Sequence, residues 1–128
     1  MPPIHMERAE SAIRTVIAFT EAFNHHDIIA MLNLFSDDCI YEASSPAPDG
    51  MVHKGKTAIT HYWQEYFTRS SQAHLKIEQT LGFGLRCIVL WCCDWVDPSG
   101  STSHLRGIDI FLVQNNLITE HQSYTKRN

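Results

Sequence analysis

The first half of the chain is dominated by apolar residues that recur at steps of three and four. Over residues 7–24 this spacing places the apolar side chains on one face, which predicts an amphipathic helix. Asp27 follows an Asn-His-His break and can cap a second, shorter helix that continues to Phe35. Gly55 precedes a third helix, predicted over residues 56–68. We therefore expect three helices in this half of the chain.

The pattern changes to alternation in the second half. A short strand is predicted between the second and third helices, over residues 39–43, and turn residues dominate 44–50. Alternating or continuous apolar runs then predict four further strands, over residues 73–80, 85–96, 103–113 and 117–124. Helices first and a strand meander afterwards indicate an α+β domain, with an antiparallel sheet covered on one face by helices.

Composition narrows the class of protein. The chain has 128 residues, of which 44% are hydrophobic and 19% charged, so we expect one globular domain over residues 1–128. No apolar run is long enough to cross a bilayer, no signal peptide is visible, and a net charge of −4 disfavours nucleic acid and anionic membranes as partners. We expect a cytoplasmic protein.

Neither the cysteines nor the histidines have the spacing of a metal site. The four cysteines form no C-x-x-C pair, and they are expected to be buried free thiols in a reduced cytoplasm. The eight histidines are scattered, apart from the pair at residues 25–26. No phosphate loop, dinucleotide fingerprint or nucleophile motif is present, so we expect no metal and no cofactor.

Five short segments in this order resemble one superfamily. They are Phe-Asn-His-His-Asp at 23–27, Leu-Phe-Ser-Asp-Asp-Cys at 34–39, Gly-Lys-Thr-Ala-Ile at 55–59, Gly-Ile-Asp-Ile-Phe at 107–111 and Leu-Ile-Thr-Glu-His at 117–121. In order and spacing the chain resembles the SnoaL-like group of the nuclear transport factor 2-like, or ketosteroid isomerase-like, superfamily. The resemblance implies a cone-shaped barrel, in which a strongly bent antiparallel sheet packs on three N-terminal helices around a pocket.

The superfamily includes ketosteroid isomerase, polyketide cyclases, dehydratases, epoxide hydrolases and non-catalytic binding proteins, so the fold leaves the function open. Many members are homodimers that pair through the outer face of the sheet. Apolar residues on both faces of the predicted strands favour the same assembly here, because helices can cover only one face.

Asp109 is the most informative residue, because it lies in an otherwise apolar strand. A carboxyl beside Phe111 is expected to be held neutral by desolvation, and could then donate a hydrogen bond or act as a general acid. By resemblance, Asp109 corresponds to the protonated oxyanion-hole Asp of ketosteroid isomerase. The alternative is an Asp that is satisfied by a structural partner. Ala43 and Phe19 stand where that enzyme has its base and its tyrosine, so steroid isomerisation by its mechanism is not expected.

Other residues are candidates for the same pocket. Tyr41 and Asp94 join Asp109 as candidate catalytic residues, and Asp94 could instead be a solvent-exposed Asp at a hairpin end. The register that decides whether Trp91 and Trp95 face the pocket or a dimer surface is open. By resemblance, Glu120, Gln122 and Tyr124 look into the cone and His121 faces out. The candidate ligand contacts are Phe19, Phe23, Trp63, Phe111, Glu120, Gln122, Tyr124 and His53.

Three functions are consistent with these residues. The first is a cofactor-free acid–base enzyme (an isomerase, cyclase, dehydratase or hydrolase) acting on a mostly apolar carbonyl or polyketide-like compound. The second is a non-catalytic dimer that binds a small apolar molecule with one or two polar groups. The third is a structural dimer whose cone is filled by its own side chains. For the first two we expect a cavity of about 300 Å³ or more that touches Asp109 and Trp63, whereas a filled cone would favour the third.

Overall fold

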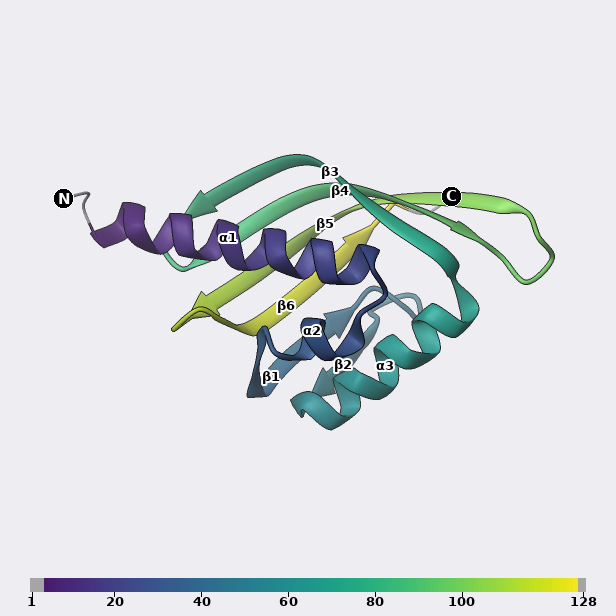
Figure 1. The fold of residues 1–128 in the computed structure, drawn as a ribbon, viewed down its shortest axis with the longest axis horizontal. Helices are drawn as coiled ribbons and strands as arrows, with labels where there is room; N and C mark the ends of the chain where they lie inside the picture. The colour runs from purple at the N-terminus through teal and green to yellow at the C-terminus, as the bar shows by residue number, and fades with distance from the viewer. Residues whose placement is uncertain (1–3, 127–128) are drawn as a thin grey trace.

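The computed structural model describes the backbone of residues 4–126 and the side chains of residues 9–126. Within residues 4–126, three helices and six strands follow one another (Figure 1). The helices are α1 (Ile4–Asn24), α2 (Ile28–Leu32) and α3 (Gly55–Arg69). The strands are β1 (Phe35–Ala43), β2 (Met51–Lys54), β3 (Ser71–Phe83), β4 (Arg86–Val96), β5 (Thr102–Gln114) and β6 (Leu117–Thr125).

The strands form one six-stranded sheet in the order β2-β1-β6-β5-β4-β3. The predicted meander from β3 to β6 is confirmed, since each of these strands pairs antiparallel with the next. The α+β class, with a bent sheet packed on helices, is confirmed, and the sheet is mixed because β1 runs parallel to β6. The order is also linear, with β2 and β3 at its two ends, so the bent sheet is open rather than a closed barrel.

The region around α2 and β2 differs most from the sequence prediction. The Asp27 side chain does cap α2, accepting a hydrogen bond from the Ala30 N–H at 3.0 Å. The helix ends at Leu32, however, and Phe35 already belongs to β1. β2 was not predicted. It is an edge strand in which Met51 and Val52 are about half exposed, so its sequence does not alternate between buried apolar and exposed polar residues.

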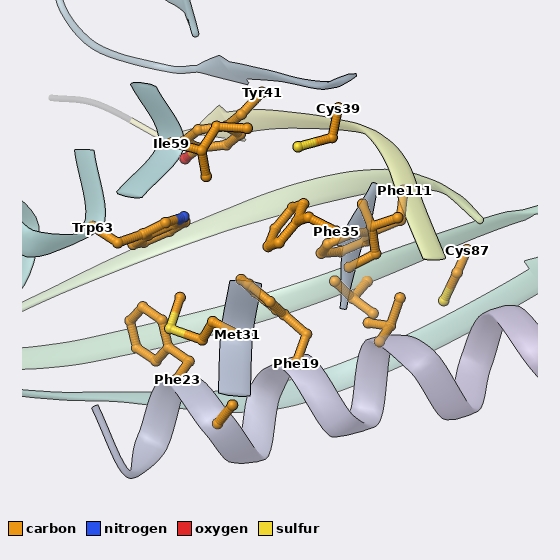
Figure 2. Packing of buried hydrophobic residues seen from close by; sticks show 14 of the residues in the cluster. Phe19, Phe23, Met31, Phe35, Cys39, Tyr41, Ile59, Trp63, Cys87 and Phe111 are labelled. Carbon is orange, nitrogen blue, oxygen red and sulfur yellow. The ribbon is translucent and has the colours of Figure 1, made fainter. Parts of the chain in front are cut away.

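Helix α1 lies along the long strands, while α2 and α3 lie near β1 and β2 (Figure 1). The core fills the space between these layers. Phe19 and Phe23 point from α1 toward the sheet, opposite Tyr41 of β1 and Trp63 of α3 (Figure 2). All four side chains are at most 5% exposed. The helices therefore cover one face of the sheet and create an aromatic interior.

The other face of the sheet is left without a helix. Cross-strand partners share a face, and the pairs Leu81–Ile88 and Leu90–Ile108 lie on this side. Leu81 and Ile108 are 46% and 41% exposed. The neighbouring cysteines of β4 separate as alternation predicts, with Cys93 buried inside and Cys92 only half-buried on the outer side. We call this side of β3–β6 the outer face.

None of the described helices is long and apolar enough to cross a membrane.

Candidate functional site

An aromatic cavity of about 120 Å³ opens between the helices and the concave side of the sheet. It touches both Asp109 and Trp63, as the sequence predicts, but it is smaller than the predicted 300 Å³ because large side chains occupy much of the cone. A cavity of about 150 Å³ can hold benzene, so this space accepts a small molecule or one end of a larger one. Its lining comprises Phe19, Phe23, Tyr41, Ser44, Ser45, Tyr62, Trp63, Tyr66, Leu75, Trp91, Cys93, Leu105, Asp109, Ser123 and Thr125.

Three side chains hold the Asp109 carboxyl group. The Trp91 indole Nε1–H donates to Oδ1 at 2.9 Å, and the Ser123 hydroxyl donates to the same oxygen at 2.7 Å. His121 Nε2 lies 2.7 Å from Oδ2. The strand register explains this convergence, because Ser123 is directly opposite Asp109 on β6, and β4 carries Trp91 on the other side of β5. The Asp109 side chain is only 12% exposed.

His121 supports the carboxyl from behind and is itself 1% exposed. Its ring is stacked between Tyr41 and Phe111, with centroid separations of 4.5 and 4.2 Å. Among the described residues, Nδ1 of this ring has no hydrogen-bond partner. A hydrogen on Nδ1 would be a buried, unpaired donor, so the geometry favours a hydrogen on Nε2, which donates to Asp109.

Asp109 then accepts three hydrogen bonds, one from each of Trp91, Ser123 and His121. This differs from the expected role of Asp109 as a neutral hydrogen-bond donor, because all three partners are oriented as donors. A carboxylate has about four positions for acceptance, and one remains on Oδ2 for a ligand. Asp109 is therefore arranged to accept a proton or a hydrogen bond.

The tyrosines and the thiol of the cavity remain protonated. Burial raises the pKa of Tyr41, Tyr62 and Tyr66 above the usual value of 10.0, and the nearby negative charge of Asp109 acts in the same direction on all three. Burial also raises the pKa of the Cys93 thiol, whose sulfur lies 3.5 Å from the Tyr66 hydroxyl. These groups can donate hydrogen bonds, but they are poor bases and nucleophiles at neutral pH.

The predicted orientation of β6 is wrong by one residue. His121 pairs with Phe111 across β5 and β6, and this pairing turns His121 inward and its neighbours outward. Glu120 faces Arg86 at 3.9 Å, and Gln122 donates to a Glu42 oxygen at 3.3 Å, so neither lines the cavity. Tyr124, also predicted to face inward, is 53% exposed.

Three other candidate residues lie outside the cavity. Asp94 is exposed near the β4–β5 turn, beside a separate shallow recess. Phe111 is 1% exposed and belongs to the packed core. His53 lies on β2 near the cavity aromatics, with its ring centroid 4.9 Å from that of Tyr62 and 6.1 Å from that of Tyr41, and burial lowers its pKa. Phe19, Phe23, Tyr41, Trp63 and Asp109 do line the cavity.

The sequence prediction missed several residues of the site. Ser123 and His121 are spaced two apart on β6, but only the register with β5 shows that they reach Asp109. Trp91 was left open for the same reason, while Tyr62 and Tyr66 had the spacing of core residues on α3.

The described residues contain no group of three His, Cys, Asp or Glu side chains that could hold a metal ion.

Comparison with known proteins identifies the relatives of this fold. A SnoaL-like domain model matches residues 16–121. A nuclear transport factor 2-like protein of unknown function from Mesorhizobium loti is 28% identical, with a TM-score of 0.77 and 94% of each chain covered.

Two further solved structures share the fold. RV0760c from Mycobacterium tuberculosis, in complex with estradiol-17β-hemisuccinate, is 22% identical with a TM-score of 0.79, and 89% of this chain and 92% of that chain are covered. A protein of ketosteroid isomerase-like fold from Catenulispora acidiphila, in complex with trimethylamine, is 16% identical with a TM-score of 0.78, and 86% and 83% are covered. No curated protein matches the chain.

Proposed function

We propose that this chain, which belongs to the SnoaL-like domain family, binds a small, mostly apolar compound in the aromatic cavity and removes a proton from it with Asp109. The observation that carries the proposal is a carboxylate, held by three donors, at the wall of an otherwise uncharged cavity. Related folds crystallised with estradiol-17β-hemisuccinate and with trimethylamine support a small-molecule ligand.

The proposed chemistry needs no cofactor. Asp109 would act as general base, because it is the one carboxylate among the described residues of the cavity wall and partners on two neighbouring strands fix its position. Tyr62 accepts a hydrogen bond from the Tyr41 hydroxyl at 3.4 Å and keeps its own hydrogen for a ligand. The proton that Asp109 removes then comes from the ligand. It is lost from an N–H group, or from a C–H group beside a carbonyl or iminium group.

The test uses cyclohexanone, a probe about the size of benzene. In D₂O the protein should accelerate exchange of the hydrogens beside the carbonyl, followed by proton NMR. Asp109→Asn should lower the protein-dependent exchange rate by about 100-fold, the lower range for loss of a general base. Asp94→Asn is the matched control, because Asp94 is exposed and outside the cavity. Equal exchange by Asp109→Asn and the unmodified protein would rule out the proton transfer.

A non-catalytic binding protein is the second candidate. It is favoured by the protonated state of the other polar groups in the cavity, since the raised pKa values of Tyr62 and Tyr66 leave Asp109 without a second ionised partner. In that case cyclohexanone should shift the indole N–H signal of Trp91 in a ¹⁵N-correlated NMR spectrum without any protein-dependent exchange. The two functions are thus separated in a single sample.

We also propose that the protein is a homodimer through the outer face. Leu81 and Ile108 are 46% and 41% exposed on this face, and Phe83 at the end of β3 is 59% exposed. Apolar side chains gathered on one side of a sheet are typical of an interface between protein chains. A second copy would cover them with two-fold symmetry.

A further inference from the structure

Among the described residues, the cavity wall has no Lys, Arg or His to balance a charge on Asp109, while His121 lies behind the wall, 2.7 Å from Oδ2. Among the described residues that line the cavity, Asp109 alone is an Asp, Glu, Lys, Arg or His. Its partners Trp91 and Ser123 are uncharged donors, and the buried His121 ring has no hydrogen-bond partner for a hydrogen on Nδ1 in the described part of the chain. Hydrogen bonds satisfy the carboxylate oxygens but leave one negative charge away from bulk water, which is costly unless a cation pairs with it.

The rest of the wall attracts positive charge as well. Aromatic rings from α1, β1, α3 and β4 line the space, and the faces of Trp, Tyr and Phe rings attract cations. Burial raises the pKa of Tyr41, Tyr62 and Tyr66, and the nearby Asp109 acts in the same direction on all three hydroxyl groups. The guanidinium of Arg69 acts on Tyr62 in the opposite direction, but its effect is smaller than that of Asp109.

We infer that the ligand of this cavity is a small organic cation, an ammonium or iminium compound with apolar substituents. The inference rests on the proposed function, because it assumes that the cavity is the ligand site, and it adds the sign of the ligand's charge. Charge and size act together: about 120 Å³ has room for a few methyl groups around a nitrogen but not for a large hydrated ion.

A second recess beside the cavity is lined by carboxylates as well. An outer recess of about 360 Å³ shares Ser44, Ser123 and Thr125 with the cavity wall, so the two spaces adjoin. The recess adds Glu42 and Asp49 to its own wall, and none of its lining residues is Lys or Arg. Carboxylates in this recess raise the local concentration of cations beside the cavity and lower that of anions.

The experiment compares three probes of similar shape and different charge: tetramethylammonium, tert-butanol and trimethylacetate. Each is titrated into the full chain, and the indole N–H signals are followed by ¹⁵N-correlated NMR. Trp63 and Trp91 line the cavity, while Trp95 lies at the separate recess near the β4–β5 turn and serves as an internal reference. Because tetramethylammonium has no N–H, its binding reports charge and shape without proton transfer.

Tetramethylammonium should shift the Trp91 signal and bind at least about tenfold more tightly than tert-butanol, as expected for a partly desolvated cation among aromatic rings. Trimethylacetate should not bind. Asp109→Asn should reduce the preference for the cation to about threefold or less, while Asp94→Asn should leave it unchanged. The probe series on the unmodified protein remains decisive even if Asp109→Asn fails to fold.

The outcomes separate this inference from the proposed function. If tert-butanol binds as well as tetramethylammonium, the ligand site stands and the inferred charge is wrong. If none of the three probes shifts Trp63 or Trp91, the cavity is not a ligand site and both proposals fall. The ¹⁵N shifts of His121 give an independent check, since a ring protonated on both nitrogens would supply the missing cation internally and overturn the inference.

Discussion

Gly107 offers the sharpest test of how the site is built, because it lies directly opposite Trp91 on the neighbouring strand. Because glycine has no side chain, space is left on β5 at residue 107, two residues before Asp109. The structure shows that the indole ring of Trp91 occupies that space. A Cβ atom at residue 107 would collide with Cζ2 of Trp91 and lie 2.5 Å from the Tyr124 carbonyl oxygen.

Gly107→Ala therefore forces either the indole or strand β6 to move. Overpacking of this kind costs about 1–3 kcal/mol. If the indole moves, its hydrogen bond to the Asp109 carboxylate is lost as well, and a hydrogen bond to a charged group contributes about 1.5–3 kcal/mol. With both effects, we expect the free energy of unfolding to fall by about 2.5–6 kcal/mol, measured by urea denaturation with circular dichroism.

Gly82→Ala is the matched control within the same sheet. Its added Cβ would meet mainly the end of the Ile13 side chain, with Cδ1 at 2.8 Å, and a flexible side chain can move away. We expect its cost to remain below about 1 kcal/mol, because alanine also loses less backbone entropy than glycine on folding. A larger loss in Gly82→Ala than in Gly107→Ala would contradict this explanation.

A double-mutant cycle with Trp91→Phe separates the two collisions. Phenylalanine lacks Cζ2 and the indole N–H, so Gly107→Ala should cost less in the Trp91→Phe background, with a coupling of at least about 1 kcal/mol. The Tyr124 carbonyl oxygen is still close in the double variant, so rescue should be partial. Strictly additive losses would refute the idea that Gly107 is there to accommodate Trp91.

Three further predictions concern the thiols, the pH dependence and the assembly. Burial raises the pKa of Cys39 and Cys87 to about 11, so a disulfide reagent at pH about 8 should modify half-buried Cys92 first and all four thiols only after unfolding, as counted by mass spectrometry. Burial lowers the pKa of His53 from its ordinary value of 6.5, so the unfolded chain binds a proton more readily than the folded chain. The free energy of unfolding should therefore fall as the pH drops through 6.5, and this fall should be smaller in His53→Gln. Ile108→Lys should convert the proposed dimer to a monomer in light scattering, and a monomer before substitution would rule out the assembly.

The sequence predicted the helices and the meander because their evidence is local. Apolar steps of three and four mark α1 and α3, and alternation with turn residues marks β3 to β6. The parallel pairing of β1 with β6 joins strands from opposite ends of the chain, and no local pattern encodes which strands become neighbours. The prediction of a wholly antiparallel sheet was therefore an extrapolation from the meander.

The site was harder to predict because it depends on register. Asp109 was recognisable as a carboxyl in an apolar strand, and Tyr41 and Trp63 were placed correctly in the cavity wall. His121 was assigned to the wrong face because its orientation follows from pairing with β5, where the register shifts between residues 112 and 113. A shift of one residue exchanges the two faces of a strand. The prediction was displaced by one residue, so it placed the outward neighbours of His121 and Ser123 in the cavity.

The polar group at the cavity is better explained by ligand binding than by stability. Buried ion and hydrogen-bond networks can often be replaced by well-packed apolar side chains with no loss of stability. Asp109 lies among large aromatic side chains that could pack around a leucine, and its charge has no cation beside it among the described residues of the cavity wall. The network that holds it uses partners from β4 and β6, so the carboxylate is fixed from both sides while one acceptor position is left open. Burying this carboxylate is costly for the free protein, and its open acceptor position lacks a positively charged or proton-donating partner. Both features are expected of a binding site.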